Sequence, residues 1–182
     1  MKLPTTVDVL DHTWDILKEI CTTKTALSAV TLATVDRDDQ PQVCLVVLRA
    51  VDRDHRILEF HTDADSLKCQ SLARNPKAQI LIWHEINAVQ LRLSVEVSLW
   101  QGKRAAELWK KVPSPSQIAY GKQPPTGTVI NGPLEYKTLS AEEKFLVAEC
   151  QTTKIDYLSL KEDHFRVQFE KKNGWSGNWI SP

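Results

Sequence analysis

The chain has 182 residues, and its 23 Lys and Arg side chains balance 23 Asp and Glu side chains. This length suits one domain, residues 1–182, with a core large enough to fold without disulfides or metals. Zero net charge argues against nucleic acid as a main partner, because binding to the phosphate backbone depends on a basic surface. We find no apolar run long enough to cross a bilayer and no signal peptide, so we expect a cytoplasmic protein with no membrane partner.

The cysteines and histidines are scattered along the chain. No Cys-x-x-Cys pair occurs, and no His stands at metal-ligand spacing from a Cys. We therefore expect four free thiols in a reducing compartment and no metal site.

The N-terminal segment has the pattern of an amphipathic helix. Thr5-x-x-Asp8 resembles a capping box. Apolar residues then recur at steps of three and four, as on one face of a helix: Val7, Leu10, Trp14, Leu17 and Cys21.

A meander of short strands is predicted next, at residues 27–35, 43–48, 57–60 and 78–83, with a short helix before Asn75-Pro76. The segment from Val43 to Leu48 is almost wholly apolar, so we expect burial on both faces. Residues 89–99 alternate strictly between apolar and polar, which predicts a long strand with one face on a core and the other on water, a cofactor or a partner subunit.

The C-terminal half mixes helices, a loop and strands. We predict helices at 102–111, around 116–118 and from Ser140 to about Glu149, with an ordered Gly- and Pro-rich loop at 121–133. Two closing strands follow, with a hairpin turn at Asn173-Gly174. The whole pattern favours a mainly β fold with helices, a small antiparallel barrel of six or seven strands with peripheral helices.

An anion site is predicted where the third strand gives way to the short helix. Ser66 and Lys68 lie in that turn, directly after His61-Thr62. Free N–H groups and the positive dipole end of a helix would act together with the ammonium group. A phosphate is the expected guest, which points to a phosphorylated cofactor.

The order of these motifs resembles the pyridoxamine-phosphate oxidase family and, more broadly, the FMN-binding split barrels. The resemblance covers roughly residues 25–182 and rests on shared order and spacing. Its motifs are Val46-Val47-Leu48-Arg49, His61-Thr62, Ser66-x-Lys68, Asn75-Pro76, Gln90, Ser116-Gln117-Ile118, Lys122-Gln123, Trp175 and Ile180-Ser181-Pro182.

The resemblance implies an FMN-dependent oxidoreductase acting on a small molecule, as a homodimer with the cofactor in the interface. Ser66 and Lys68 would hold the phosphate, Gln90 the flavin edge, and Gln123 would reach FMN from the opposite subunit. The implied cofactor-binding residues are Leu45, Val46, Val47, Leu48, Arg49, His61, Thr62, Ser66, Lys68, Gln90 and Gln123. The substrate side would be Arg49, Ser116, His164 and Arg166, and no catalytic residue is identified.

The chain departs from the family at several charged positions. Cys44 and Leu67 stand where the family commonly has Arg, and Gln168 falls where a further FMN-contacting Arg is expected. The anchors for a substrate phosphate are also largely missing, with only Ser116 left, so we expect a substrate other than pyridoxamine phosphate. Two alternatives stay open: a non-enzymatic flavin- or heme-binding module, and a cofactor-free dimeric interaction protein on the same fold.

Overall fold

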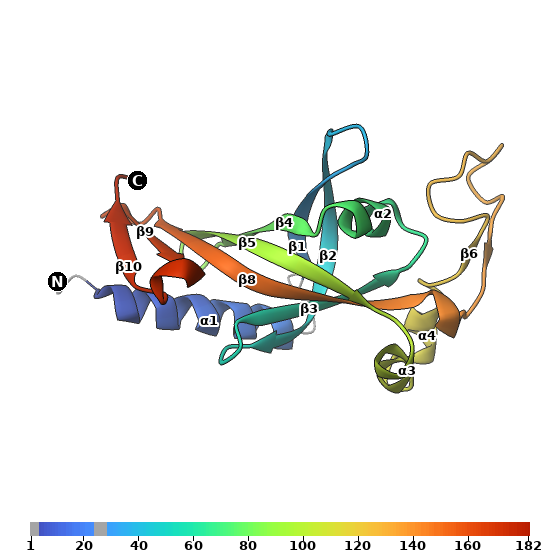
Figure 1. The fold of residues 1–182 in the computed structure, drawn as a ribbon, viewed down its shortest axis with the longest axis horizontal. Helices are drawn as coiled ribbons and strands as arrows, with labels where there is room; N and C mark the ends of the chain where they lie inside the picture. The colour runs from blue at the N-terminus through green and yellow to red at the C-terminus, as the bar shows by residue number, and fades with distance from the viewer. Residues whose placement is uncertain (1–3, 24–28) are drawn as a thin grey trace.

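A computed structural model describes residues 4–23 and 29–182 (Figure 1). Its main sheet is antiparallel, in the order β10-β9-β8-β3-β2-β1-β4-β5, and β5 pairs back onto β8. Six strands thereby close into a barrel, and β9 and β10 extend from β8. The strands are β1 (Ala29–Val35), β2 (Pro41–Asp52), β3 (Ile57–Asp63), β4 (Lys77–His84), β5 (Val89–Trp100), β8 (Phe145–Ser159), β9 (Phe165–Glu170) and β10 (Gly177–Ile180).

Alternation along the strands fills this barrel. On β5 the predicted alternation is confirmed, because Val89, Leu91, Leu93, Val95 and Val97 are all buried while the residues between them face outward. Side chains of a strand point alternately to its two faces, so one apolar set per strand is enough to pack the interior. The mainly β fold and the six-strand antiparallel barrel are therefore as predicted. Residues 27 and 28 of the first predicted strand lie outside the described residues.

The N-terminal helix α1 (Thr6–Thr22) packs against β2, β9 and β10 (Figure 1). Its capping box is confirmed, since Thr5 N–H donates to Asp8 Oδ2 (2.8 Å) and Asp8 N–H donates to Thr5 Oγ1 (3.2 Å). The predicted apolar face is partly wrong: Val7 is exposed, whereas Val9 is buried with Trp14 and Leu17. Two positions two residues apart point to opposite sides of a helix, so only one of the two valines can face the barrel.

The prediction that β2 is buried on both faces is wrong. Val46 and Leu48 are buried, but Val43 is 67% and Leu45 69% exposed. Only the inner face of β2 meets the barrel core. Its outer face has no covering helix within the described chain, so the apolar run does not by itself mean two-sided burial.

The predicted helix from Ser140 to Glu149 is also wrong. Only one 3₁₀ turn forms, η2 (Glu142–Lys144), and the chain then enters β8. Phe145 to Ala148 are all buried, and β8 pairs with β3 on one side and with β5 on the other. A capping signal satisfies one turn locally, but strand pairing on both edges decides the conformation of the residues after it.

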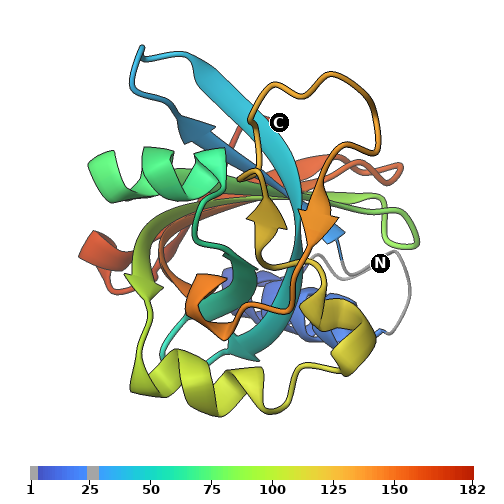
Figure 2. The same cartoon turned by 90° about the vertical axis from the view of Figure 1, so that its right-hand side faces the viewer.

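The segment between β5 and β8 projects from one end of the barrel (Figure 2). It contains α3 (Lys103–Trp109), α4 (Ser114–Gln117) and a small hairpin of β6 (Lys122–Gln123) and β7 (Lys137–Thr138). The helices at 102–111 and 116–118 are thus confirmed in outline. At the other end, Gly174 has the left-handed φ of +61° between η3 (Lys171–Asn173) and β10, as the Asn-Gly turn predicts. No helix in the described ranges combines the length and apolar character needed to span a bilayer.

Candidate functional site

The barrel opens between β2 and β3. These strands pair from Leu48–Phe60 to Asp52–Ile57, and beyond that β3 pairs with β8 while β2 pairs with β1. The edge of β2 before Leu48 therefore has no strand partner on its β3 side among the described residues. Backbone N–H and C=O groups at such an edge are available to a ligand. The backbone of Leu45 to Val47 forms this edge, and Leu48, the last residue of the segment predicted to lie along the flavin ring, pairs with Phe60.

Three predicted cofactor residues meet at the turn after β3. Lys68 Nζ donates to Thr62 Oγ1 (3.2 Å), and the hydroxyl oxygens of Thr62 and Ser66 lie 3.3 Å apart. Thr62 and Ser66 are buried, and Lys68 is half-buried. Two hydroxyls and an ammonium group thus converge within seven residues of sequence.

Helix α2 (Leu67–Arg74) adds donors to this cluster. Ser66 is its N-cap residue, but the Ser66 side chain makes no capping hydrogen bond. The backbone N–H groups of Leu67 and Lys68 form no hydrogen bond within the described residues. Amides at a helix N-terminus favour an anion. The donor set of hydroxyls, amides and an ammonium therefore fits the phosphate of FMN.

Two carboxylates, Asp63 and Asp65, lie near this cluster. Asp63 accepts from the N–H of Gly121 (2.8 Å) and from the N–H of Asp65 (2.8 Å). Asp65 is paired with Lys144 at 2.8 Å. Asp65 thus has a cationic partner, whereas the two partners of Asp63 are neutral backbone amides, and neither carboxylate forms an ion pair with Lys68 among the described residues.

His61 is not brought into this cluster. Its Nε2 lies 2.9 Å from Glu59 Oε1, and its ring meets the edge of Phe145 at 4.8 Å between centroids. Neighbouring residues of a strand point to opposite faces, so His61 and Thr62 diverge. The hydrogen bond with His61 holds the pKa of Glu59 below its usual value against the effect of burial, and Arg104 (3.1 Å) acts in the same direction.

Gln90 and Arg166 share a row on the outer face of the sheet. Gln90 on β5 is opposite Leu158 on β8, and Leu158 is opposite Arg166 on β9. Gln90 is half-buried and faces outward, between the inward Val89 and Leu91. The structure thus brings two of the predicted residues onto one surface, separated by a single strand.

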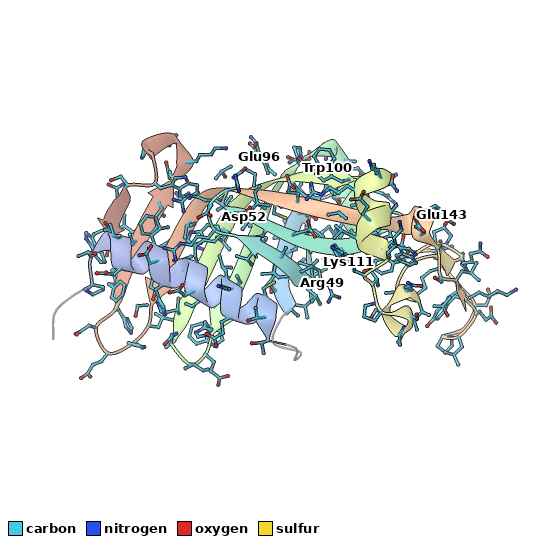
Figure 3. All side chains as sticks on the ribbon, turned by 90° about the horizontal axis from the view of Figure 1, so that it is seen from below. Arg49, Asp52, Glu96, Trp100, Lys111 and Glu143 are labelled. Atoms are coloured by element: carbon cyan, nitrogen blue, oxygen red, sulfur yellow. The ribbon has the colours of Figure 1, made fainter. Side chains whose placement is uncertain are left out.

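The remaining predicted residues lie apart from each other. Arg49 is exposed at a bulge of β2, on the side of the barrel that also carries α1 and α3 (Figure 3). Ser116 on α4 and Gln123 on β6 belong to the projecting segment, whereas His164 and Arg166 belong to the β9 end (Figure 1). Within this chain the predicted substrate side is therefore not assembled.

Sequence reasoning missed the most connected polar group, Asp156 on β8. Its carboxylate accepts two hydrogen bonds from Arg166 (2.8 and 2.9 Å), one from Arg92 (2.8 Å) and one from Gln168 (2.8 Å). Burial raises the pKa of Asp156, but these bonds outweigh it and lower the pKa to about 2. Outward polar positions on three strands were the only signal in the sequence, and their cross-strand partners become known only from the register.

Comparison with known proteins shows the family to which this chain belongs. Residues 11–101 match the family described as pyridoxamine 5'-phosphate oxidase, FMN-binding domain. A pyridoxine/pyridoxamine 5'-phosphate oxidase of Serratia proteamaculans is 30% identical over 176 residues, which cover 94% of this chain and 75% of that protein. The chain belongs to this family.

Other relatives match over a shorter part of their length. The oxidase of Psychrobacter cryohalolentis is 35% identical over 105 residues, 57% of this chain and 47% of that protein. The matched region therefore spans about half of that relative, and the figure for the Psychrobacter arcticus oxidase is 46%.

Solved structures share the fold. An FMN-binding protein of Nostoc punctiforme, described as related to pyridoxamine 5'-phosphate oxidase, superposes with a TM-score of 0.75 at 19% identity, covering 100% of both chains. PhzG of Burkholderia lata, solved with tetrahydrophenazine-1-carboxylic acid, gives 0.77 at 16% identity, covering 100% of this chain and 98% of that one. The FMN-binding split-barrel fold predicted from the sequence is thus confirmed.

Proposed function

We propose that this protein is an FMN-dependent oxidoreductase that acts on a small molecule other than pyridoxamine phosphate. The observation that carries the proposal is the convergence of Thr62, Ser66 and Lys68 with free α2 amides at the end of β3, the strand whose pairing leaves part of the β2 edge open, in a chain of an FMN-binding family. Bound FMN would supply the two-electron redox chemistry, and the protein would supply binding, orientation and exclusion of water.

Each of the proposed binding groups has a distinct task. Lys68 and the two hydroxyls hold the phosphate through charge-assisted hydrogen bonds. The unpaired backbone edge of β2 offers donors and acceptors to the ring. Gln90 is opposite Leu158 on β8 whereas Thr62 is opposite Leu146, so Gln90 lies at the other end of the barrel and its amide would reach the ring edge from the second subunit. Cys44 and Leu67 supply no guanidinium, so the phosphate is held by fewer charges than where Arg occupies these positions.

A homodimer with the cofactor in its interface is part of the proposal. Leu45, Thr31 and Leu81 form a row across β2, β1 and β4, and the two leucines are exposed. Trp83, the next outward residue on β4, is 55% exposed. A contiguous apolar surface of this kind is typical of a protein–protein interface. A second subunit would also bring the projecting segment of one chain to the β9 end of the other.

The residues at the family's substrate-phosphate positions support a different substrate: Leu108 or Trp109, Val112 and Ser116. Trp109 is buried, and its ring packs on Tyr120 (5.6 Å) and Phe145 (5.4 Å). Leu108 and Val112 pack against the same cluster. An apolar cluster cannot hold a phosphate dianion, which requires charged partners.

The first test is the visible absorption spectrum of the purified protein, followed by titration with FMN and with riboflavin. We expect yellow protein, or a melting temperature that rises with FMN, since saturating ligand at about 100 times its Kd adds about 2.7 kcal/mol. Colourless protein with an unshifted melting temperature would favour the cofactor-free alternative. Sustained turnover of reduced flavin with NAD(P)H would exclude the alternative of a non-enzymatic flavin- or heme-binding module.

Lys68→Ala sharpens this test. Loss of the ammonium should weaken FMN roughly 10- to 100-fold, because a hydrogen bond to a charged group contributes about 1.5–3 kcal/mol. Riboflavin, which has no phosphate, should bind almost as before. Lys18→Ala, at an exposed position on α1, is the matched control. Equal losses for both ligands would contradict the phosphate role of Lys68.

A further inference from the structure

A second group of polar and charged side chains lies away from the turn of Ser66 and Lys68. Five of the six residues that line a pocket of about 220 Å³ on the outer face of β4, β5, β8 and β9 carry hydrogen-bond donors in their side chains, and the sixth is the fully engaged Asp156. They are Gln79, Arg92, Ser94, Lys154, Asp156 and Gln168. Gln168 falls where the family has an FMN-contacting Arg, and the other five have no role in the proposed FMN and substrate sites.

The strand register places these residues in two neighbouring rows. Arg92, Asp156 and Gln168 are opposite one another on β5, β8 and β9, and Gln79, Ser94 and Lys154 form the next row on β4, β5 and β8. Side chains on directly opposed positions of a sheet lie within reach of each other. The pocket is therefore built on paired strands rather than on loops.

Asp156 fixes the geometry of Arg92. Its side chain is only 6% exposed, and both of its oxygens are engaged by Arg92, Arg166 and Gln168. Arg92 uses one Nη2 hydrogen bond for this contact, and its Nε and Nη1 groups have no partner among the described residues. A guanidinium held at one end and open at the other is suited to paired hydrogen bonds with an oxyanion.

The remaining lining groups also offer donors. The Ser94 hydroxyl oxygen accepts from Gln79 Nε2 (3.1 Å), so its own hydrogen is free to point elsewhere. Lys154 lies at the rim, 3.2 Å from Glu170, which is also paired with Lys172 at 2.7 Å.

Positive charge is in excess around the pocket. The four cations Arg92, Arg166, Lys154 and Lys172 face the two carboxylates of Asp156 and Glu170. The next outward carboxylate on β5, Glu96, is opposite Lys77 on β4 and brings its own counter-charge.

We propose that the pocket of Arg92, Ser94 and Lys154 binds an oxyanion, either the phosphate or the carboxylate of a small molecule, and that Asp156 is the positioning residue that orients Arg92 for it. The pocket shares no lining residue with the turn of Ser66 and Lys68, but it borders the proposed dimer surface, because Arg92 is directly opposite Leu81.

Residue-resolved NMR on the full chain tests this proposal. Inorganic phosphate is titrated into ¹⁵N-labelled protein at constant ionic strength, and succinate is titrated in parallel to distinguish a phosphate site from a carboxylate site. We expect saturable shifts of the Arg92 side-chain Nε–H signal and the Ser94 amide signal, with a Kd of about 1 mM, or −4.1 kcal/mol. Shifts at Ser66 and Lys68 report separately on the cofactor cleft.

Two variants keep the assignment falsifiable. Arg92→Gln and Lys154→Gln should each weaken the anion at least about fivefold, or about 1 kcal/mol, while the Ser66 and Lys68 signals keep their response. Arg37→Gln, at a fully exposed guanidinium in the β1–β2 turn, should leave the affinity unchanged. Absence of saturable shifts at Arg92, shifts that chloride reproduces, or full binding in both pocket variants would each overturn the proposal.

Discussion

The turn after β3 and the outer face around Asp156 use polar groups in opposite ways. At the turn, Thr62, Ser66 and Lys68 come from one short stretch of sequence, and the neighbouring amides of α2 have no internal partner. Around Asp156 on β8, the two neighbouring strands β5 and β9 supply donors that saturate one buried carboxylate. Unsatisfied donors indicate a place for a ligand, whereas a saturated carboxylate indicates a support for its neighbours.

This contrast predicts that substitutions in the two regions affect different properties, and Asp156→Ala should have the largest effect. The substitution leaves the guanidinium groups of Arg166 and Arg92 without their carboxylate acceptor. The free energy of unfolding should therefore fall by about 3 kcal/mol. Urea denaturation measures the loss, with Asp38→Ala at an exposed position as the control. A loss under about 0.5 kcal/mol would mean that the carboxylate does not support the sheet.

Ser66→Ala should show the reverse pattern. Removing one hydroxyl from the phosphate site should weaken FMN about 10-fold, since a hydrogen bond to a charged group contributes about 1.5 kcal/mol or more. Stability should change little, because the Ser66 side chain does not cap α2. Parallel titrations of FMN and urea on this variant measure both quantities. Unchanged FMN affinity would remove Ser66 from the site.

Acid should affect the outer face selectively. Because the pKa of Asp156 is lowered to about 2 from 3.8, its contribution to stability is present above the unfolded-state pKa and is lost as pH falls from about 4 towards 2. Urea midpoints of the wild type should therefore fall more steeply between pH 4 and 2.5 than those of Asp156→Asn, which cannot titrate. If the urea midpoints of the two proteins changed with pH in parallel, the ionised carboxylate of Asp156 would contribute no stability through its partners.

Arg92→Ala should have the smallest effect on stability. The Arg92 side chain is 42% exposed and makes one of the four hydrogen bonds to Asp156, so its loss should cost at most about 1 kcal/mol. Arg166→Ala, which removes two bonds at a less exposed position, should cost more. The same urea measurement compares them, and a larger loss for Arg92 would reverse the order of importance proposed for the two arginines.

Sequence by itself determined the features that depend on local pattern. The capping box at Thr5, the alternation from Val89 to Leu99 and the grouping of Ser66 with Lys68 are all set within a few residues, because side-chain direction follows directly from helix or strand periodicity. The order of the motifs along the chain was enough to indicate the family, and the family resemblance predicted the barrel fold.

Only the tertiary structure decided what depends on partners distant in the chain. The segment at 145–149 is a strand because β3 and β5 pair with it on both sides, although a capping signal precedes it. The outer face of β2 is exposed because no described element covers it, and Asp156 becomes a hub because the register sets it opposite Arg92 and Gln168. Strand pairing and burial depend on residues that are distant in the chain. The local sequence pattern is therefore compatible with more than one conformation, and only the closed barrel selects one of them.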